Sequence, residues 1–221
     1  MKTINNFINE KLKITKKMLN NQYEFVDLGL SVKWAKYNIG VNPNKLTTAS
    51  DWYGNYYAWG ELAEKTEYNW TNYKYANGAS DKLTKYCNNS NYGNDGFTDN
   101  LTQLVPEDDV ATVTNSAWRM PTKAELEELK TLPRQWVTNY NGVSGLNGIV
   151  FTGSNKNTLF IPAAGFVIGS DILNVDSFCD IWSSSLDSTR PSRAHILRVA
   201  SDSIIVTGAN RFYGYCVRPV C

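Results

Sequence analysis

The chain has 221 residues, with 22 basic and 21 acidic side chains and a net charge of +1. This length fits one domain, or one domain with a short extension. The balanced charge argues against a general nucleic-acid binder and against an acidic disordered tail. The sequence contains no run of 18 apolar residues, so a membrane-spanning helix is excluded as well.

The first predicted element is a short amphipathic helix at residues 4–19. Ile4, Phe7, Ile8 and Leu12 recur at helical spacing beside a basic flank. So short a helix needs a partner surface, which is either a carrier protein or the chain's own domain. The opening residues lack the uninterrupted apolar core of a secretory signal, so we expect synthesis in a host cytoplasm without a signal peptide.

From residue 23 the pattern changes to short strands and many turns. An apolar, strand-like run at 25–34 is interrupted by Gly29. Residues 76–100 are polar and rich in Asn and Gly, which predicts a long loop. The segment 94–96 lacks the alternating ligands and terminal Glu of a calcium loop, so we interpret it as an ordinary turn.

The clearest helix is predicted to begin at Thr122. Thr122 and Glu125 have the spacing of a capping box, Pro121 disfavours an earlier start, and Pro133 ends the helix. One clear internal helix followed by many short strands favours an α+β fold over a parallel α/β sheet. The strand candidates after the helix are 149–152, 158–162, 166–168, 181–184, 195–199, 203–206 and 215–220.

Catalytic signatures are weak. The chain has a single histidine, His195, and we expect the neighbouring arginines to lower its basicity and compete for any carboxylate. The acidic cluster at 107–109 is expected in a turn, and the glutamates at 125–128 are expected on the exposed side of a helix. Neither cluster resembles a catalytic pair. The four cysteines show no C-x-x-C spacing, so reduced thiols are expected. We therefore predict a protein that is not an enzyme, with no catalytic residues, no metal and no cofactor.

The composition shifts after Trp182. The last 39 residues contain no Lys, Glu, Gln, Met or Trp, although these types supply 37 of the first 182 residues. All fifteen Lys lie at or before Lys156, whereas five of the seven Arg lie at or after Arg190. The C-terminal stretch is therefore compositionally distinct from the rest of the chain.

Several phrases of the sequence, taken in order, resemble a family abundant in Bacteroides-type gut bacteria and their phages. That family is related to the Fibrobacter succinogenes major paralogous domain, and the resemblance spans residues 23–221. The phrases that carry it are 26–35 (VDLGLSVKWA), 53–61 (YGNYYAWGE), 106–111 (PEDDVA), 118–122 (WRMPT), 162–165 (PAAG), 182–185 (WSSS) and 217–220 (VRPV).

The resemblance implies a C-type-lectin-like fold of the formylglycine-generating-enzyme branch. In that fold Arg119 and Arg218 are expected to hold buried backbone or carboxylates. Enzymatic members use a cysteine pair near copper, and Cys216 and Cys221 lack the expected surroundings. The tryptophans of these phrases are expected to serve chiefly in packing, namely Trp34, Trp59, Trp118 and Trp182.

The resemblance also includes the variable proteins of diversity-generating retroelements. There, adenine-directed mutagenesis at AAY codons produces fifteen residue types and never Lys, Glu, Gln, Met or Trp. These are the types that are missing after Trp182. Residues 182–221 are thus either a diversified region or part of a fixed lectin-like domain, and the sequence leaves both open.

The expected organisation is a docking or targeting helix at residues 1–22 and a C-type-lectin-like domain at 23–221. The expected function is non-enzymatic binding of a protein or glycan ligand on a bacterial surface. Residues 4–19 would attach the protein to a virion or scaffold carrier, with no nucleic-acid or membrane partner. The alternatives are a fixed structural or adhesin module and an enzyme of the formylglycine-generating type. The ligand-binding side chains are expected to project from one face of the last strands and loops, and they are Asp187, Thr189, Arg190, Ser192, Arg193, His195, Arg198, Asn210, Phe212, Tyr213 and Tyr215.

Overall fold

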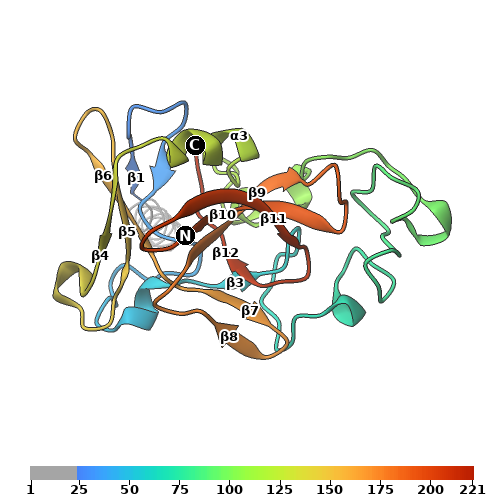
Figure 1. The fold of residues 1–221 in the computed structure, drawn as a ribbon, viewed down its shortest axis with the longest axis horizontal. Helices are drawn as coiled ribbons and strands as arrows, with labels where there is room; N and C mark the ends of the chain where they lie inside the picture. Colours follow the sequence, from blue (N-terminus) through green and yellow to red (C-terminus); the bar gives the residue numbers. More distant parts are fainter. Residues whose placement is uncertain (1–23) are drawn as a thin grey trace, which may run out of the picture.

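The computed structural model describes residues 24–221 (Figure 1). The helix predicted at 4–19, and with it the segment 1–22, lies outside the described residues. The described chain is a mixed α+β fold with few helices and several small sheets, as the sequence predicted. A central sheet lies beneath helix α3 (Lys123–Lys130), and the hairpin of β7 (Phe166–Ile168) and β8 (Asp171–Leu173) lies on the opposite side (Figure 1).

The central sheet has five strands in the order β11-β10-β9-β12-β3. Only the pairing of β12 with β9 is parallel, and the other pairings are antiparallel. The long strand β9 is almost completely buried because both faces of the sheet are covered at its centre. The five strands are β3 (Tyr56–Tyr57), β9 (Cys179–Leu186), β10 (Arg193–Val199), β11 (Ile204–Asn210) and β12 (Tyr215–Cys216).

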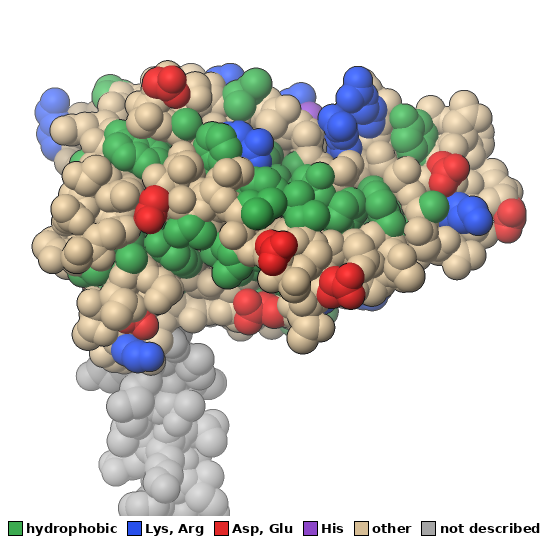
Figure 2. Space-filling view, turned by 60° about the horizontal axis from the view of Figure 1, so that its bottom comes forward, with side chains coloured by type: hydrophobic (Ala, Val, Ile, Leu, Met, Phe, Trp, Pro, Cys, Tyr) green, Lys and Arg blue, Asp and Glu red, His purple; other side chains and the backbone are tan. Residues whose placement is uncertain are grey.

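Three smaller sheets surround this centre. One is the antiparallel set of β4 (Arg134–Val137), β5 (Gly148–Thr152) and β6 (Thr158–Pro162). Another is the β7–β8 hairpin, which joins the centre through a bridge between Val167 and Gly214. The turned view, in which the lower side of Figure 1 comes forward, shows hydrophobic side chains gathered in a belt across the molecule (Figure 2).

The two ends of the described chain lie together. Strands β1 (Phe25–Val26) and β2 (Trp34–Ala35) pair with each other, and the intervening turn contains Gly29 at φ +74°. The predicted interruption at Gly29 is therefore confirmed, although the segment between the two strands is not itself a strand. Beside β2, the backbone N–H of Ala35 donates to the carbonyl of Pro219 at 2.8 Å.

The strand predicted at 215–220 is wrong beyond Cys216. Pro219 has no N–H to donate to a ladder. The segment instead supplies carbonyls, with Val217 accepting from the Ile39 N–H and Pro219 from the Ala35 N–H. The end of the chain is thus held against β2 by isolated contacts and not by continuous sheet pairing.

The helices are short. Besides α3 there is α2 (Val110–Thr114), which was not predicted because its five residues are mostly β-branched. The carboxylate of Asp109 caps α2 by accepting from the N–H groups of Ala111 and Thr112. Residues 24–221 also contain five 3-10 turns, at Ala49–Trp52, Trp70–Asn72, Asn94–Gly96, Pro106–Asp108 and Tyr140–Gly142.

The capping box of α3 forms as predicted. The Glu125 N–H donates to Thr122 Oγ1 at 3.3 Å, and the Thr122 N–H donates to the Glu125 carboxylate at 2.7 Å. We expect Thr122→Ala to lower the free energy of unfolding by about 1 kcal/mol, because a free amide at the helix start loses its acceptor. Urea unfolding measures the change, with the exposed Ser201→Ala as the control. An unchanged value for Thr122→Ala would mean that the cap does not stabilise α3.

The four tryptophans expected to serve packing do so. Trp34, Trp59 and Trp182 have no exposed surface, and Trp118 is 9% exposed. The Nε1–H of Trp59 donates to the Ser183 carbonyl, and that of Trp182 to the Tyr57 carbonyl, so these rings join segments more than 100 residues apart.

Candidate functional site

The last strands divide the predicted site residues between two faces of the central sheet. In β10, Ile196 and Arg198 point to one side and His195 and Leu197 to the other, since strand side chains alternate. Helix α3 packs against β9, β10 and β11. Lys123 and Glu127 of α3 interact electrostatically with His195, which places His195 on the side covered by α3. The opposite side faces β7.

On the side of β7 the sheet is hollowed. A hollow of about 260 Å³ lies between β10, β11, β7 and the turn that leads into β12. We call it the C-terminal hollow. The bridge between Val167 and Gly214 sets its depth by joining β7 to that turn. Its lining residues are Phe166, Ile168, Arg193, Ile196, Arg198, Thr207, Gly208, Ala209, Asn210, Tyr213 and Tyr215.

Arg198 is fixed at the inner side of the C-terminal hollow. Its Nε and Nη2 donate to the two oxygens of the buried Asp180 carboxylate at 3.0 and 2.7 Å. Nη2 also donates to the Tyr215 hydroxyl, and the guanidinium carbon lies 5.3 Å from the centre of the Phe166 ring. Burial raises the pKa of Asp180 to about 6, against the opposing effect of Arg198. Arg198 is therefore a rigid, pre-oriented cation.

Arg193 and Asn210 face each other across β10 and β11. The Asn210 amide donates to the Tyr213 hydroxyl at 3.2 Å, which connects β11 to the turn before β12. Arg193 has no ion pair within 4 Å in the part of the chain that the structure describes. The lining set contains no Asp or Glu. The Asp187 carboxylate lies close by, since its Oδ2 is 2.7 Å and the Arg193 side chain 3.5 Å from the position that a Cβ on Gly208 would occupy, but it forms no ion pair with Arg193.

Aromatic rings form the remaining wall. Tyr213 lies 5.8 Å from Phe166 and 4.6 Å from Phe212, measured between ring centres. Phe212 itself turns toward Trp70, at 5.1 Å, and does not line the C-terminal hollow. The half-buried Tyr213 ring thus offers an apolar surface beside the two arginines.

The expectation that all eleven predicted residues project from one face is wrong. The structure brings together Arg193, Arg198, Asn210, Tyr213 and Tyr215. Of these, Tyr215 is only 1% exposed and forms part of the floor of the hollow. The other six lie elsewhere, with Phe212 against Trp70, Ser192 buried, His195 on the side of α3, and Asp187, Thr189 and Arg190 in the turn between β9 and β10.

The turn between β9 and β10 is ordered by its own polar groups. The Thr189 hydroxyl and N–H both donate to Asp187 Oδ1, at 2.6 and 3.0 Å, and the Arg193 N–H donates to the Arg190 carbonyl. The side chain of Arg190 is exposed and lies outside the C-terminal hollow. Arg190 and Arg193 are therefore close in sequence but differ in surroundings. Arg190 is exposed in the turn, whereas Arg193 begins β10 and lines the C-terminal hollow.

The pKa of His195 is lowered, in the direction that the sequence predicted, but for another reason. Burial of the ring is the largest cause, and Lys123 of α3 is the next. The neighbouring arginines are not among the main causes. The half-buried His195 has no carboxylate partner within 4 Å in the described chain.

A buried arginine that sequence reasoning missed, Arg211, lies between β11 and β12. Arg211 has no exposed surface. Its Nε donates to the Tyr73 hydroxyl, and its Nη atoms donate to the carbonyls of Pro191, Tyr86 and Lys85 at 2.9, 3.1 and 3.0 Å. The partners are at least 20 and mostly more than 120 residues away in sequence, so no local pattern reveals them.

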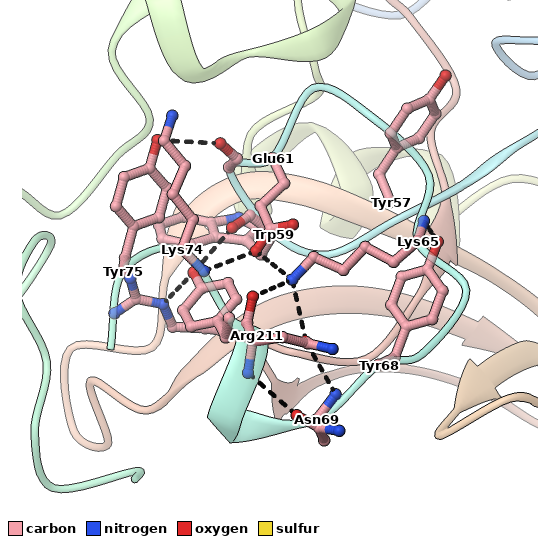
Figure 3. A network of polar contacts seen from close by, with 12 residues as sticks. Tyr57, Trp59, Glu61, Lys65, Tyr68, Asn69, Lys74, Tyr75 and Arg211 are labelled. Carbon is pink, nitrogen blue, oxygen red and sulfur yellow. Dashed lines mark hydrogen bonds and ion pairs between the residues drawn. The ribbon is translucent and has the colours of Figure 1, made fainter. Parts of the chain in front are cut away.

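Arg211 belongs to a polar network within the aromatic core (Figure 3). Its guanidinium carbon lies 5.0 Å from the centre of the Trp59 ring. Lys65 and the backbone N–H of Lys74 both contact the Glu61 carboxylate at 2.8 Å. The Arg211 N–H donates to the Ser192 carbonyl, so the network holds the start of β10 and the turn before β12 at a fixed separation.

Arg218 and Arg119 make the kinds of contact that the resemblance implied. Arg218 is buried and donates to the Asn38 side chain and to the carbonyls of Ala35 and Lys36. Arg119 contacts the Glu125 carboxylate and the Met120 carbonyl. Both side chains hold backbone or a carboxylate, as expected, and neither lines the C-terminal hollow.

Several other features bear on chemistry. All four cysteines have free thiols, of which Cys221 is exposed. Within residues 24–221, no group of three or more His, Cys, Asp and Glu side chains is placed to hold a metal ion. The same part of the chain has no helix of the length and apolarity needed to cross a membrane.

Comparison with protein-family models, curated proteins and solved structures found no match to this chain.

Proposed function

We propose that this protein is a non-enzymatic binding protein that presents its C-terminal sheet face to a protein or glycan ligand on a bacterial surface. The observation that carries the proposal is the C-terminal hollow, where Arg193, Arg198, Asn210 and Tyr213 converge and where Arg193 forms no ion pair within the described chain. Arginine and tyrosine are the side chains that most often dominate binding energy. A concave surface with a few convergent polar groups is the usual form of a ligand site.

The proposal includes the fold family and the setting that the sequence resemblance implies. The domain would be C-type-lectin-like, and residues 4–19 would attach it to a virion or scaffold. Support comes from the α+β architecture and from strands β10 and β11, whose residues Arg193, Arg198 and Asn210 line the C-terminal hollow. The same residues would be the diversified region of a retroelement variable protein.

The binding proposal is tested by screening glycans and bacterial surface proteins with three variants of the full chain. We expect Arg193→Ala and Tyr213→Ala to lower affinity for the captured ligand about tenfold or more, since each removes a wall of the hollow. Arg190→Ala removes the same charge from the same turn and should bind as wild type does. Wild-type binding by both hollow variants would show that this face is wrong.

The diversification proposal is tested in the flanking DNA. We expect a reverse-transcriptase gene and a second copy of the bases that encode residues 182–221, differing only at adenines. Absence of such a copy would leave a fixed lectin-like domain.

A further inference from the structure

We infer that the C-terminal hollow binds the carboxylate of an acidic sugar residue, an inference that rests on the proposed function. The first argument is charge. Arg193 lines the hollow and forms no ion pair within residues 24–221, and no acidic side chain lines the hollow. The buried Asp180 is already engaged by two nitrogens of Arg198. The Asp187 carboxylate lies beside Gly208 and the Arg193 side chain without forming an ion pair, so the Arg193 guanidinium stays unpaired and can bind a monovalent anion.

The second argument is the supply of free donors. Arg198 uses Nε and Nη2 for Asp180 and Tyr215, whereas its Nη1 has no acceptor in the described chain. The side chain is 30% exposed, and its orientation is fixed by those bonds and by Phe166. Arg198 Nη1 can therefore donate to a carboxylate that the Arg193 guanidinium also holds, and a donor whose orientation is already fixed loses little entropy on binding.

The third argument is size. The volume of about 260 Å³ lies below the roughly 300–1,000 Å³ of pockets that enclose drug-sized ligands. A long peptide or an oligosaccharide cannot be enclosed, so the hollow admits one compact group. A single sugar ring that carries a carboxylate is of this class.

The rest of the wall of the C-terminal hollow also suits a sugar ring. Phe166 and Tyr213 offer aromatic surface, against which the C–H face of a sugar ring can pack. Asn210 and Thr207 offer polar atoms for ring hydroxyls, and the Thr207 hydroxyl makes no hydrogen bond within the described residues. A simple carboxylate such as acetate would use the arginines alone. A uronate would use the arginines, the aromatic wall and these polar groups together.

The inference is tested by calorimetric titration of the full chain with D-glucuronate and D-galacturonate. The comparison ligands are D-glucose, D-galactose, acetate and glucose 6-sulfate. We expect both uronates to bind at least about tenfold more tightly than the neutral sugars and acetate, because only they combine charge with a ring. Equal binding of uronate and neutral sugar, or stronger binding of the sulfate, would overturn the inference.

Variants locate the site. Arg193→Ala should weaken uronate binding about tenfold or more, and Arg193→Lys should restore it only in part because lysine lacks the fork. Arg190→Ala is the matched control from the same turn and should leave the dissociation constant within about twofold. Equal losses in Arg190→Ala and Arg193→Ala would place the anion elsewhere. Because the Arg193 side chain forms no ion pair within the described chain, its replacement should leave the protein folded. Circular dichroism checks that each variant is folded.

Failure of this inference is distinguishable from failure of the proposed function. If uronates do not bind but Arg193→Ala still loses the ligand captured in the screen, the hollow is a binding site for another chemistry. If Arg193→Ala changes neither measurement, both the sugar assignment and the proposed binding face are wrong.

Discussion

Replacement of Arg211 by methionine is expected to lower the free energy of unfolding by about 3–5 kcal/mol. Methionine approximates the length of the side chain but donates no hydrogen bond. The carbonyls of Pro191, Tyr86 and Lys85 would each lose a donor in a region without exposed surface. Buried acceptors without a partner cost about 1–3 kcal/mol each, and the relief of burying one charge offsets part of that sum.

Urea unfolding followed by tryptophan fluorescence measures the change. Arg190→Met is the matched control, because that arginine is exposed and forms no ion pair in the described chain. It should leave the unfolding midpoint nearly unchanged. An equal midpoint for Arg211→Met and wild type would contradict the role assigned to Arg211 in holding the start of β10 beside the turn before β12.

Asp108→Asn is expected to lower the free energy of unfolding by about 2–3 kcal/mol. The buried carboxylate accepts from Lys85 Nζ and from the Tyr86 hydroxyl, both at 2.6 Å. An asparagine at the same position keeps one acceptor oxygen but loses the charge that balances Lys85. The stability of the variant in urea, with Asp95→Asn as an exposed control, measures the effect.

Asp108 also predicts a pH dependence. Burial alone would raise its pKa, but hydrogen bonds from Lys85, Tyr75 and Tyr86 outweigh burial and lower the pKa to about 2. A lowered folded-state pKa stabilises the fold above the ordinary value of 3.8, and the stabilisation is lost as pH falls toward 2. Wild type should therefore lose more stability than Asp108→Asn between pH 4 and pH 2. Parallel losses would contradict the shifted pKa.

Sequence patterns predicted those helices and strands that are determined by residues close together in the chain. The capping box of α3 needs only residues three apart, and the strand β6 at Thr158–Pro162 needs only a short apolar run between turns. The short helix α2 escaped because its β-branched residues disfavour helix, whereas the buried cap of Asp109 stabilises it.

The sequence predicted only part of the candidate site, because the face on which a strand side chain lies depends on the register of strand pairing. Arg193, Arg198, Asn210 and Tyr213 were named from the sequence, and they line one hollow. His195 was named with them but lies on the side of α3, which only the pairing of β10 could decide. Arg211 was missed because its partners come from distant segments.

The structure explains part of the unusual composition after Trp182. That stretch supplies the end of β9 and all of β10, β11 and β12, and strands disfavour Lys and Glu. Burial does not account for the absence of Met and Trp, which are common in cores. Tyr215 and Arg211 are 1% and 0% exposed, so diversification would be tolerated only at the surface positions around them.

The measurement that tests the central claim most directly is a chemical-shift titration of isotope-labelled protein with D-glucuronate. The account predicts saturable shifts in the backbone amides of Arg193, Arg198, Asn210 and Tyr213. It also predicts the loss of these shifts in Arg193→Ala and their retention in Arg190→Ala. Shifts confined to other parts of the molecule, or no shifts at all, would contradict binding of an acidic sugar in the C-terminal hollow.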